Sequence, residues 1–111
     1  MKKVAIIILN YKNSKDTIEC VESLEKIKYK NFEIIIVDND SRDESIKTLR
    51  SYFKDKYIVL ESNKNGGFAY GNNVGIKYAL DNGADYILLI NNDTTVEENF
   101  LDVLIETAEK D

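Results

Sequence analysis

Four short apolar runs separated by helical patterns constrain the fold of this chain more than any other feature of its sequence. The runs are rich in Ile and Val and do not alternate with polar residues, which is typical of strands covered on both faces. They span residues 4–9, 32–37, 57–60 and 86–90. After each run, apolar residues recur at steps of three or four, as expected of a helix with one buried face. The sequence therefore predicts the order β-α-β-α-β-α-β-α.

This alternation predicts an α/β fold with a parallel sheet, because strands joined through helices form right-handed crossovers. The helices are expected on both faces of the sheet, in three layers of the Rossmann-like kind. The chain has 111 residues and contains no repeat or linker, so we interpret residues 1–111 as a single domain.

Local signals predict where some helices begin and end. Ser41 with Glu44, and Thr95 with Glu98, have the spacing of capping boxes, which suggests helix starts at these serine and threonine residues. The Asn-Gly pair at 82–83 follows the helical pattern between the third and fourth apolar runs, and it predicts the end of that helix.

Composition and charge exclude several classes of function. Twenty acidic against fifteen basic residues leave a net charge of −5, which argues against nucleic acid as a partner. Histidine is absent, so Ser-His-Asp and Cys-His catalysis and histidine-ligated metal sites are excluded. The single cysteine, Cys20, is compatible with a reducing compartment. We expect a cytoplasmic protein, and a peripheral association of the full-length form with the inner face of the membrane stays open.

Polar residues collect directly after each predicted strand. They occupy residues 10–11, 38–41, 62–67 and 91–94. In an open parallel sheet the carboxyl ends of the strands form one edge, where ligands bind. Asn, Asp, Ser and Gly are also ordinary turn formers and helix caps, and this is the main role expected for Ser41 and Thr95. Four such turns on one edge nevertheless favour a site for a polar ligand.

The turns restrict the class of that ligand. Asp38 ends the second strand, where a dinucleotide-binding domain has its ribose-binding acid, but the first turn at 10–14 has no glycine. An NAD-binding oxidoreductase is therefore disfavoured, and no phosphate-binding P-loop motif occurs. Gly67, Gly71 and Gly75 form a row on one helix face. This row indicates either close packing of the helix or the passage of a bulky ligand.

The turn Asn91-Asn92-Asp93 offers only oxygen ligands. Any metal bound there would be a hard cation such as Mg²⁺ or Mn²⁺, held by few carboxylates together with a phosphate group. Such a cation would have a purpose if a diphosphate leaving group had to be neutralised.

Four motifs in this order resemble those of the family 2 glycosyltransferases with the GT-A fold, and of rhamnosyltransferase-like members in particular. The resemblance covers essentially the whole chain. The motifs are the opening strand and turn at 4–12, Val-Asp-Asn-Asp-Ser-Arg-Asp at 37–43, Asn-Lys-Asn-Gly-Gly-Phe-Ala-Tyr-Gly-Asn-Asn-Val-Gly at 63–75 and the Asp-x-Asp-like Asn-Asn-Asp at 91–93.

The resemblance implies a nucleotide-diphospho-sugar-binding domain with a sheet order of 3-2-1-4. It assigns nucleotide-sugar contacts to Asn10, Tyr11, Asp38, Asn39, Gly67, Asn73 and Asn91, and metal binding by Mn²⁺ or Mg²⁺ to Asp93. The sequence departs from the family pattern at two of these positions. Asn39 replaces a second Asp, and Asn91 replaces the first Asp of the metal motif, which removes one charge.

The expected function is the donor-binding portion of an inverting, metal-assisted glycosyltransferase that uses a UDP- or dTDP-sugar. The family's acceptor half and its catalytic carboxylate follow the Asp-x-Asp motif, and nothing in the chain corresponds to them, so we expect the chain alone to be inactive. The acceptor, a glycan or a lipid-linked sugar, is not specified. A non-catalytic nucleotide-binding or interaction module is the alternative. The strand at 86–90 would be an uncovered edge, which predicts a weak homodimer.

Overall fold

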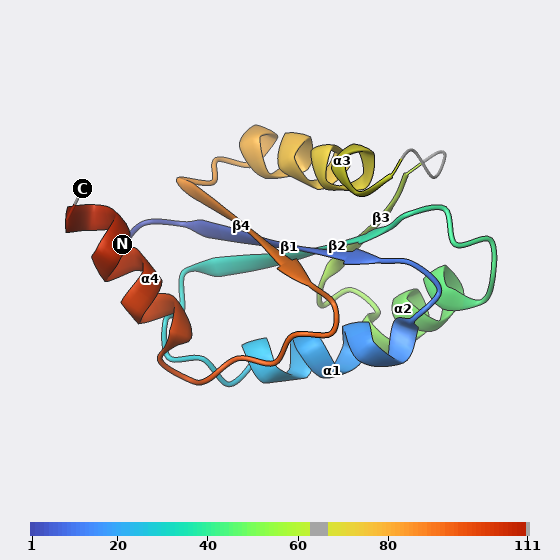
Figure 1. Ribbon diagram of the computed structural model, residues 1–111, viewed down its shortest axis with the longest axis horizontal. Coiled ribbons are helices and arrows are strands. Elements are labelled where there is room, and N and C mark those ends of the chain that lie inside the picture. Colours follow the sequence, from blue (N-terminus) through green and yellow to red (C-terminus); the bar gives the residue numbers. More distant parts are fainter. Residues whose placement is uncertain (63–66, 111) are drawn as a thin grey trace.

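The computed structural model describes residues 1–62 and 67–110, and it contains the eight predicted elements in the predicted order (Figure 1). Part of the turn after the third strand, at 63–66, lies outside the described residues. No helix within the described ranges has the length and apolarity needed to cross a membrane. The elements are β1 (Val4–Asn10), α1 (Ser14–Leu24), β2 (Phe32–Asp38), α2 (Ser45–Phe53), β3 (Ile58–Glu61), α3 (Phe68–Asp81), β4 (Tyr86–Asn91) and α4 (Phe100–Lys110).

The four strands form one parallel sheet in the order β3-β2-β1-β4, which confirms the expected topology. The register brings Asn10 opposite Asp38 at the carboxyl ends of the two central strands. On the other side of β1, Leu9 lies opposite Asn91. Polar residues from three of the predicted turns therefore begin at the same edge of the sheet.

Helices cover both faces of the sheet, as predicted, with α3 alone on one face and α1, α2 and α4 on the other (Figure 1). The alternation of side chains along β1 explains this division. Ile6 and Ile8 point into the core shared with α1, α2 and α4, whereas Ala5 and Ile7 belong to the core under α3. Both central strands are almost wholly buried, which accounts for their unbroken apolar runs.

The glycine row on α3 allows the helix to approach the sheet closely. A Cβ atom on Gly75 would lie 2.8 Å from Ile7 Cγ2, and one on Gly71 would lie 2.5 Å from Leu9 Cδ1. Both distances are shorter than van der Waals contact, so any larger residue would push α3 away from β1. Close packing is thus the reason for two of the three glycines. The third, Gly67, has a φ of 89° just before the helix.

The two predicted capping boxes are wrong. Helix α2 begins at Ser45, where Asp43 Oδ1 accepts a hydrogen bond from the Ser45 N–H at 2.8 Å. Ser41 instead donates its hydroxyl to Asp38, and Arg42 has a φ of 56°, which interrupts a helix.

The fourth helix also begins later than the spacing at 95–98 predicts, at Phe100. The sequence periodicity also predicts a buried stripe of Phe100 or Leu101, Leu104 and Ala108 on this helix, and the structure differs from it. Leu101 is buried and Ile105 packs against the core, whereas Leu104 is exposed. The predicted end of the third helix is confirmed, because α3 ends at Asp81 and the next two residues form the turn.

Candidate functional site

A buried cluster of polar side chains lies at the carboxyl edge of the sheet, as the turns predicted. Its centre is Asp38, which is 3% exposed and accepts three hydrogen bonds. Asn10 Nδ2 and Ser41 Oγ donate to Oδ1 at 2.9 and 2.7 Å, and the Ser41 N–H donates to Oδ2 at 3.2 Å. The buried carboxylate is therefore paired with hydrogen-bond donors from within the protein, which is the usual condition for burying a charge.

Asn10 connects Asp38 to the first helix. It is 0% exposed, and its Oδ1 accepts a hydrogen bond from the Thr17 hydroxyl at 2.6 Å. Its backbone carbonyl accepts from the Asn39 N–H at 2.8 Å. Because both ends of the Asn10 amide are engaged within the protein, this side chain positions Asp38. Its direct contact with a nucleotide stays a prediction.

Asn39 connects the ends of β2 and β3 to the start of α3. Its Oδ1 accepts a hydrogen bond from Ser62 Oγ at 3.0 Å, and its Nδ2 donates to the carbonyl oxygen of Gly67 at 3.4 Å. The cluster thus brings together four residues that the sequence singled out, namely Asn10, Asp38, Asn39 and Gly67.

Two members of this network, Thr17 and Asn92, were not among the predicted site residues. Asn92 Nδ2 donates to Thr17 Oγ1 at 3.2 Å and to the carbonyl oxygen of Asn13 at 3.4 Å. One signal could have identified Thr17. It occupies a position of the buried α1 stripe that continues with Val21 and Leu24, where a polar side chain needs a partner.

The loops around the cluster have an unusual backbone. Lys12, Asp40 and Arg42 all have φ values near 55°, a backbone conformation that residues other than glycine rarely adopt. The Lys12 N–H donates to Ser41 Oγ at 2.8 Å, so the two loops support each other. Backbone strain of this kind persists only where surrounding contacts hold it, and it is common at functional sites.

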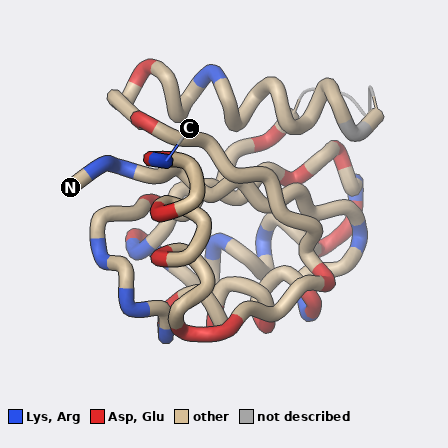
Figure 2. The backbone as a smooth tube through the Cα atoms, turned by 60° about the vertical axis from the view of Figure 1, so that its left-hand side comes forward, with Lys and Arg blue, Asp and Glu red and all other residues tan. Residues whose placement is uncertain are grey.

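A hollow of about 250 Å³ opens beside Asp38. Its lining is mainly acidic, and it comprises Asp38, Asp40, Arg42, Asp43, Ile46, Glu61 and Ser62. The hydrogen bond from the Ser45 N–H is the main cause that lowers the pKa of Asp43. The first half of α3, by contrast, contains no acidic residue, and this helix is mostly uncharged along the top of Figure 2. Acidic side chains therefore line the edge beside β2 and β3, whereas the start of α3 contributes none.

The proposed metal residue, Asp93, lies on the other side of the edge, beside α1. It lines a small hollow of about 50 Å³ together with Asp16, Glu19, Cys20 and other residues of the turn after β4. Burial is the main cause that raises the pKa of the Cys20 thiol to about 11, and the charge of Asp93 adds to it.

Within the described ranges, no three acidic or cysteine side chains form a cluster that could hold a metal ion by themselves. The donor chemistry of Asp93 nevertheless suits Mg²⁺ or Mn²⁺, which bind through one or two carboxylates when phosphate and water supply the other ligands. The residues therefore fit a cation that is shared with a bound diphosphate.

The remaining predicted residues are exposed and are not linked to the cluster by the contacts described above. Tyr11 is 45% exposed beside the Lys12 ammonium group, whose nitrogen lies 5.3 Å from the centre of the ring. Asn73 is exposed on the second turn of α3. Asn91 is exposed at the end of β4, and its carbonyl oxygen accepts a hydrogen bond from the Thr94 N–H at 3.1 Å.

The side-chain amide of Asn72 is buried near this edge, with 4% of the residue exposed. Its Nδ2 donates no hydrogen bond to any residue in the described ranges 1–62 and 67–110. Leaving such a group unpaired costs about 1–3 kcal/mol. The periodicity of the sequence places Asn72 on the stripe of the third helix, but assigns it no role in the site.

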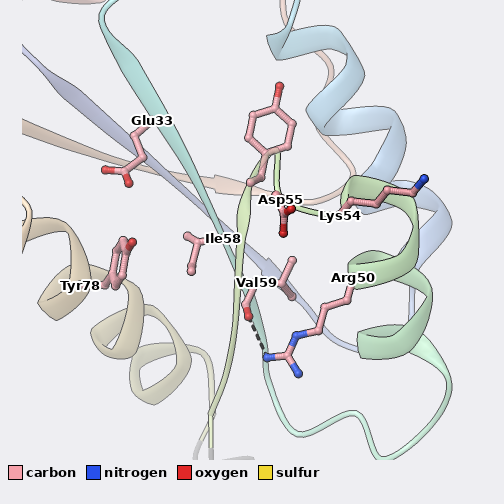
Figure 3. A pocket seen from close by; sticks show the side chains of 8 residues that line it. Glu33, Arg50, Lys54, Asp55, Ile58, Val59 and Tyr78 are labelled. Carbon is pink, nitrogen blue, oxygen red and sulfur yellow. Dashed lines mark hydrogen bonds between the residues drawn. The ribbon is translucent and has the colours of Figure 1, made fainter.

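A larger hollow, of about 670 Å³, lies away from the polar cluster, at the amino-terminal end of the edge strand β3 (Figure 3). There the guanidinium of Arg50 donates to the carbonyl oxygen of Val59 at 2.9 Å and so covers part of the strand edge. Ile58 on β3 and Tyr78 on α3 line one side of the hollow. Charged groups of both signs surround the hollow, and one lining residue, Lys54, also has a positive φ of 53°. The buried polar cluster and the strained residues Lys12, Asp40 and Arg42 are at the other end of the sheet. We therefore place the candidate site at the polar cluster.

Comparison with known proteins identifies the family. The sequence profile described as Glycosyl transferase family 2 matches residues 5–111. Glycosyltransferase GlyG of Streptococcus pneumoniae is 32% identical over 109 residues, which cover 96% of this chain and 35% of GlyG. A poly(ribitol-phosphate) beta-glucosyltransferase of Bacillus spizizenii is 39% identical over 98 residues, covering 82% of this chain and 15% of that enzyme. The chain thus spans about a third or less of the length of these relatives.

Solved structures share the fold. Residues 1–349 of S. aureus TarS superpose with a TM-score of 0.80 at 23% identity, over 97% of this chain and 32% of that chain. A complex of the same TarS fragment with UDP-GlcNAc gives a TM-score of 0.78 at 24% identity, over 97% of this chain and 31% of that one. The mannosyltransferase PcManGT from Pyrobaculum calidifontis, in complex with GDP-Man and Mn²⁺, gives 0.72 at 17% identity, over 84% and 28% of the two chains. Together with the match of the family profile, these likenesses show that the chain belongs to Glycosyl transferase family 2 and has the GT-A fold of that family's nucleotide-sugar-binding domain.

Proposed function

We propose that this chain forms the donor-binding part of an inverting glycosyltransferase, with a UDP- or dTDP-sugar as donor. The observation that carries the proposal is the buried Asn10–Asp38 pair, which holds two strained loops around a polar hollow at the carboxyl edge of the sheet. The complex of TarS with UDP-GlcNAc supports the choice of donor, because the two proteins share this fold.

The base and the diphosphate would occupy different parts of the edge. Carboxylates beside β2 and β3 would repel a diphosphate, so the pyrimidine would lie on this side of the edge, near Asp38 and Asn39. Tyr11 is exposed beside Lys12, whose N–H donates to Ser41 in the loop after β2. The Tyr11 ring would line the base pocket. Gly67, Asn73 and the exposed Asn91 would then lie along the ribose, the diphosphate and the sugar.

Asp93 would hold a Mg²⁺ or Mn²⁺ ion shared with the diphosphate. The ion, when bound, supplies positive charge that stabilises the departing nucleoside diphosphate. The complex of PcManGT with GDP-Man and Mn²⁺ supports this part of the proposal.

In the complete reaction, a hydroxyl group of a glycan or lipid-linked acceptor would attack the anomeric carbon from the face opposite the diphosphate. A carboxylate base would take the hydroxyl proton, and the bond to the diphosphate would break. Asp38 is engaged within the protein and Asp93 is assigned to the metal. We therefore expect the 111-residue chain by itself to bind the donor without transferring sugar.

Titration calorimetry with UDP, dTDP and NAD, each with Mn²⁺ and with EDTA, tests the proposal. We expect UDP or dTDP to bind more tightly with Mn²⁺, and NAD not to bind. Asp93→Ala should abolish the effect of the metal while leaving binding in EDTA unchanged. Asn99→Leu, an exposed change far from the edge, serves as the control.

Each result separates the alternatives. Equal binding with Mn²⁺ and with EDTA would contradict the role of Asp93. Binding of neither pyrimidine nucleotide would contradict the whole proposal. Nucleotide binding combined with inactivity of the full-length protein toward every nucleotide-sugar would favour a non-catalytic binding module.

We also propose that the full-length protein is cytoplasmic, with peripheral association at the inner face of the membrane as the open alternative. The support is the single, buried and unpaired Cys20, which is compatible with a reducing compartment. Fractionation of the producing cells would decide between the soluble and the membrane fraction.

A further inference from the structure

We propose that Thr17 is a positioning residue that couples the metal turn, residues 91–94, to the nucleotide site around Asp38. The proposal rests on the donor-binding function proposed above and adds a residue that none of the family motifs contains. Thr17 belongs to α1, which otherwise supplies apolar residues to the core.

A continuous chain of hydrogen bonds joins the two parts of the site through this hydroxyl. Asn92 Nδ2 donates to Thr17 Oγ1 at 3.2 Å, and Thr17 Oγ1 donates to Asn10 Oδ1 at 2.6 Å. Asn10 Nδ2 then donates to Asp38 Oδ1 at 2.9 Å. The chain crosses from the turn after β4, through α1 and the end of β1, to the end of β2.

The burial of these groups makes the connection specific. Thr17 and Asn10 are both 0% exposed, so water cannot replace a lost partner without entering the core. A hydroxyl has one proton and can donate and accept at the same time, which lets Thr17 serve both asparagines. Valine has nearly the same shape but can do neither, so Thr17→Val would break both bonds while filling the same space.

The backbone on both sides of the metal turn is held as well, because Asn91 pairs with Leu9 of β1 and the Val96 N–H donates to Ser23 Oγ at 3.2 Å. Two further contacts are made by the turn. The Asn92 amide also reaches the carbonyl oxygen of Asn13 at 3.4 Å, and the Cys20 thiol lies 3.9 Å from the carbonyl oxygen of Asn91. Both are longer and weaker than the bonds through Thr17. The Thr17 hydroxyl therefore links the metal turn directly to the Asn10–Asp38 pair, in addition to the β1–β4 pairing that ends at Asn91.

The test measures how much Mn²⁺ increases the affinity for UDP in the wild type, Thr17→Val and Thr17→Ser. We expect the factor by which Mn²⁺ raises the affinity for UDP to be at least threefold smaller in Thr17→Val than in the wild type, because the Asp93 turn is no longer aligned with the nucleotide. Thr17→Ser keeps the hydroxyl and should retain the gain. A Thr17→Val protein with the full gain would overturn the proposal, and so would a Thr17→Ser protein that loses as much as Thr17→Val.

A second variant covers the case in which Thr17→Val does not fold. Asn92→Ala removes the same chain of hydrogen bonds from its partly exposed end and should reproduce the loss of the metal-dependent gain. Retention of the full gain in Asn92→Ala would contradict the coupling.

Nuclear magnetic resonance in EDTA separates failure of this inference from failure of the proposed function. UDP bound near Asp38 should shift the side-chain amide signals of Asn92 in the wild type and in Thr17→Ser, but not in Thr17→Val. If UDP binds and the Asn92 signals do not move in the wild type, the coupling is wrong and the nucleotide site stands. If the wild type shows no metal-dependent gain, the role of Asp93 is wrong and these shifts alone decide the coupling. If UDP does not bind at all, both proposals are wrong.

Discussion

Asn10 donates a hydrogen bond to Asp38 across the ends of the two central strands, with 2.9 Å between Nδ2 and Oδ1. The two residues are partners in the parallel register, and both are almost completely buried. The pair is thus the point at which the sheet, the first helix and the loop before α2 are joined.

Replacing Asn10 with leucine should destabilise the protein strongly. The change removes one donor from the buried Asp38 carboxylate and the acceptor of the Thr17 hydroxyl, and each buried unpaired group costs about 1–3 kcal/mol. We expect the free energy of unfolding to fall by about 2–4 kcal/mol in urea titrations. Thr107→Leu, which introduces leucine at an exposed position within α4, should alter it by less than about 0.5 kcal/mol.

Replacing Gly75 with alanine should destabilise the protein, although alanine favours helices by about 1 kcal/mol. The added Cβ would lie 2.8 Å from Ile7 Cγ2 and 3.2 Å from Val37 Cγ2. Overpacking of this kind costs about 1–3 kcal/mol. We expect a net loss in thermal unfolding, and a smaller loss when Ile7→Ala provides room. An increase in stability on Gly75→Ala alone would show that α3 can move away from the sheet without cost.

Replacing Lys54 with glycine should stabilise the protein. Lys54 follows α2 with φ 53° and ψ −123°, a region that glycine enters readily and lysine does not. Relief of this strain is worth about 1 kcal/mol or more, which corresponds to a rise of about 4 °C in the midpoint of thermal unfolding. Lys47→Gly, inside α2, should instead lower it, because glycine is unfavourable in a helix.

Cys20 should be unreactive in the folded protein. Burial, followed by the charge of Asp93, raises the pKa of its thiol to about 11 from 9.0, so little thiolate is present at pH 8. We expect a thiol reagent to label Cys20 slowly in buffer and rapidly in denaturant. Because the folded pKa is the higher one, this group's contribution to stability is complete below about pH 9 and is lost as the pH rises toward 11. Rapid labelling of the native protein at pH 8 would contradict the burial.

The chain should associate weakly through β4. This strand is at one edge of the sheet, and Leu89 on it is 43% exposed. Edge strands have unpaired backbone groups that favour pairing with another chain, and each hydrogen bond contributes only about 1 kcal/mol. Sedimentation equilibrium should show a concentration-dependent dimer that Leu89→Lys dissociates. A monomer at all concentrations, unaffected by this change, would show that the edge is already protected.

The predicted strands agree with the structure to within one residue, but two helix starts were wrong. The apolar runs depend on each strand segment alone, which is why the strands could be predicted locally. The capping box at Ser41 failed because its hydroxyl donates to Asp38, three residues earlier in the chain. This local competitor is present in the sequence, but it wins because Asp40 and Arg42 adopt left-handed backbone that a helix cannot contain.

Among the site residues, the sequence by itself determined that Asn10, Asp38 and Asn39 follow strands and so share one edge of a parallel sheet. Only the tertiary structure decided that Asn10 is buried and positions Asp38, and that Thr17 and Asn92 complete the network. The physical reason is that each strand or helix is predicted by the spacing of apolar residues within its own segment. Hydrogen-bond partners, in contrast, depend on which side chains meet across the sheet, and Thr17 and Asn92 are 75 residues apart in the chain.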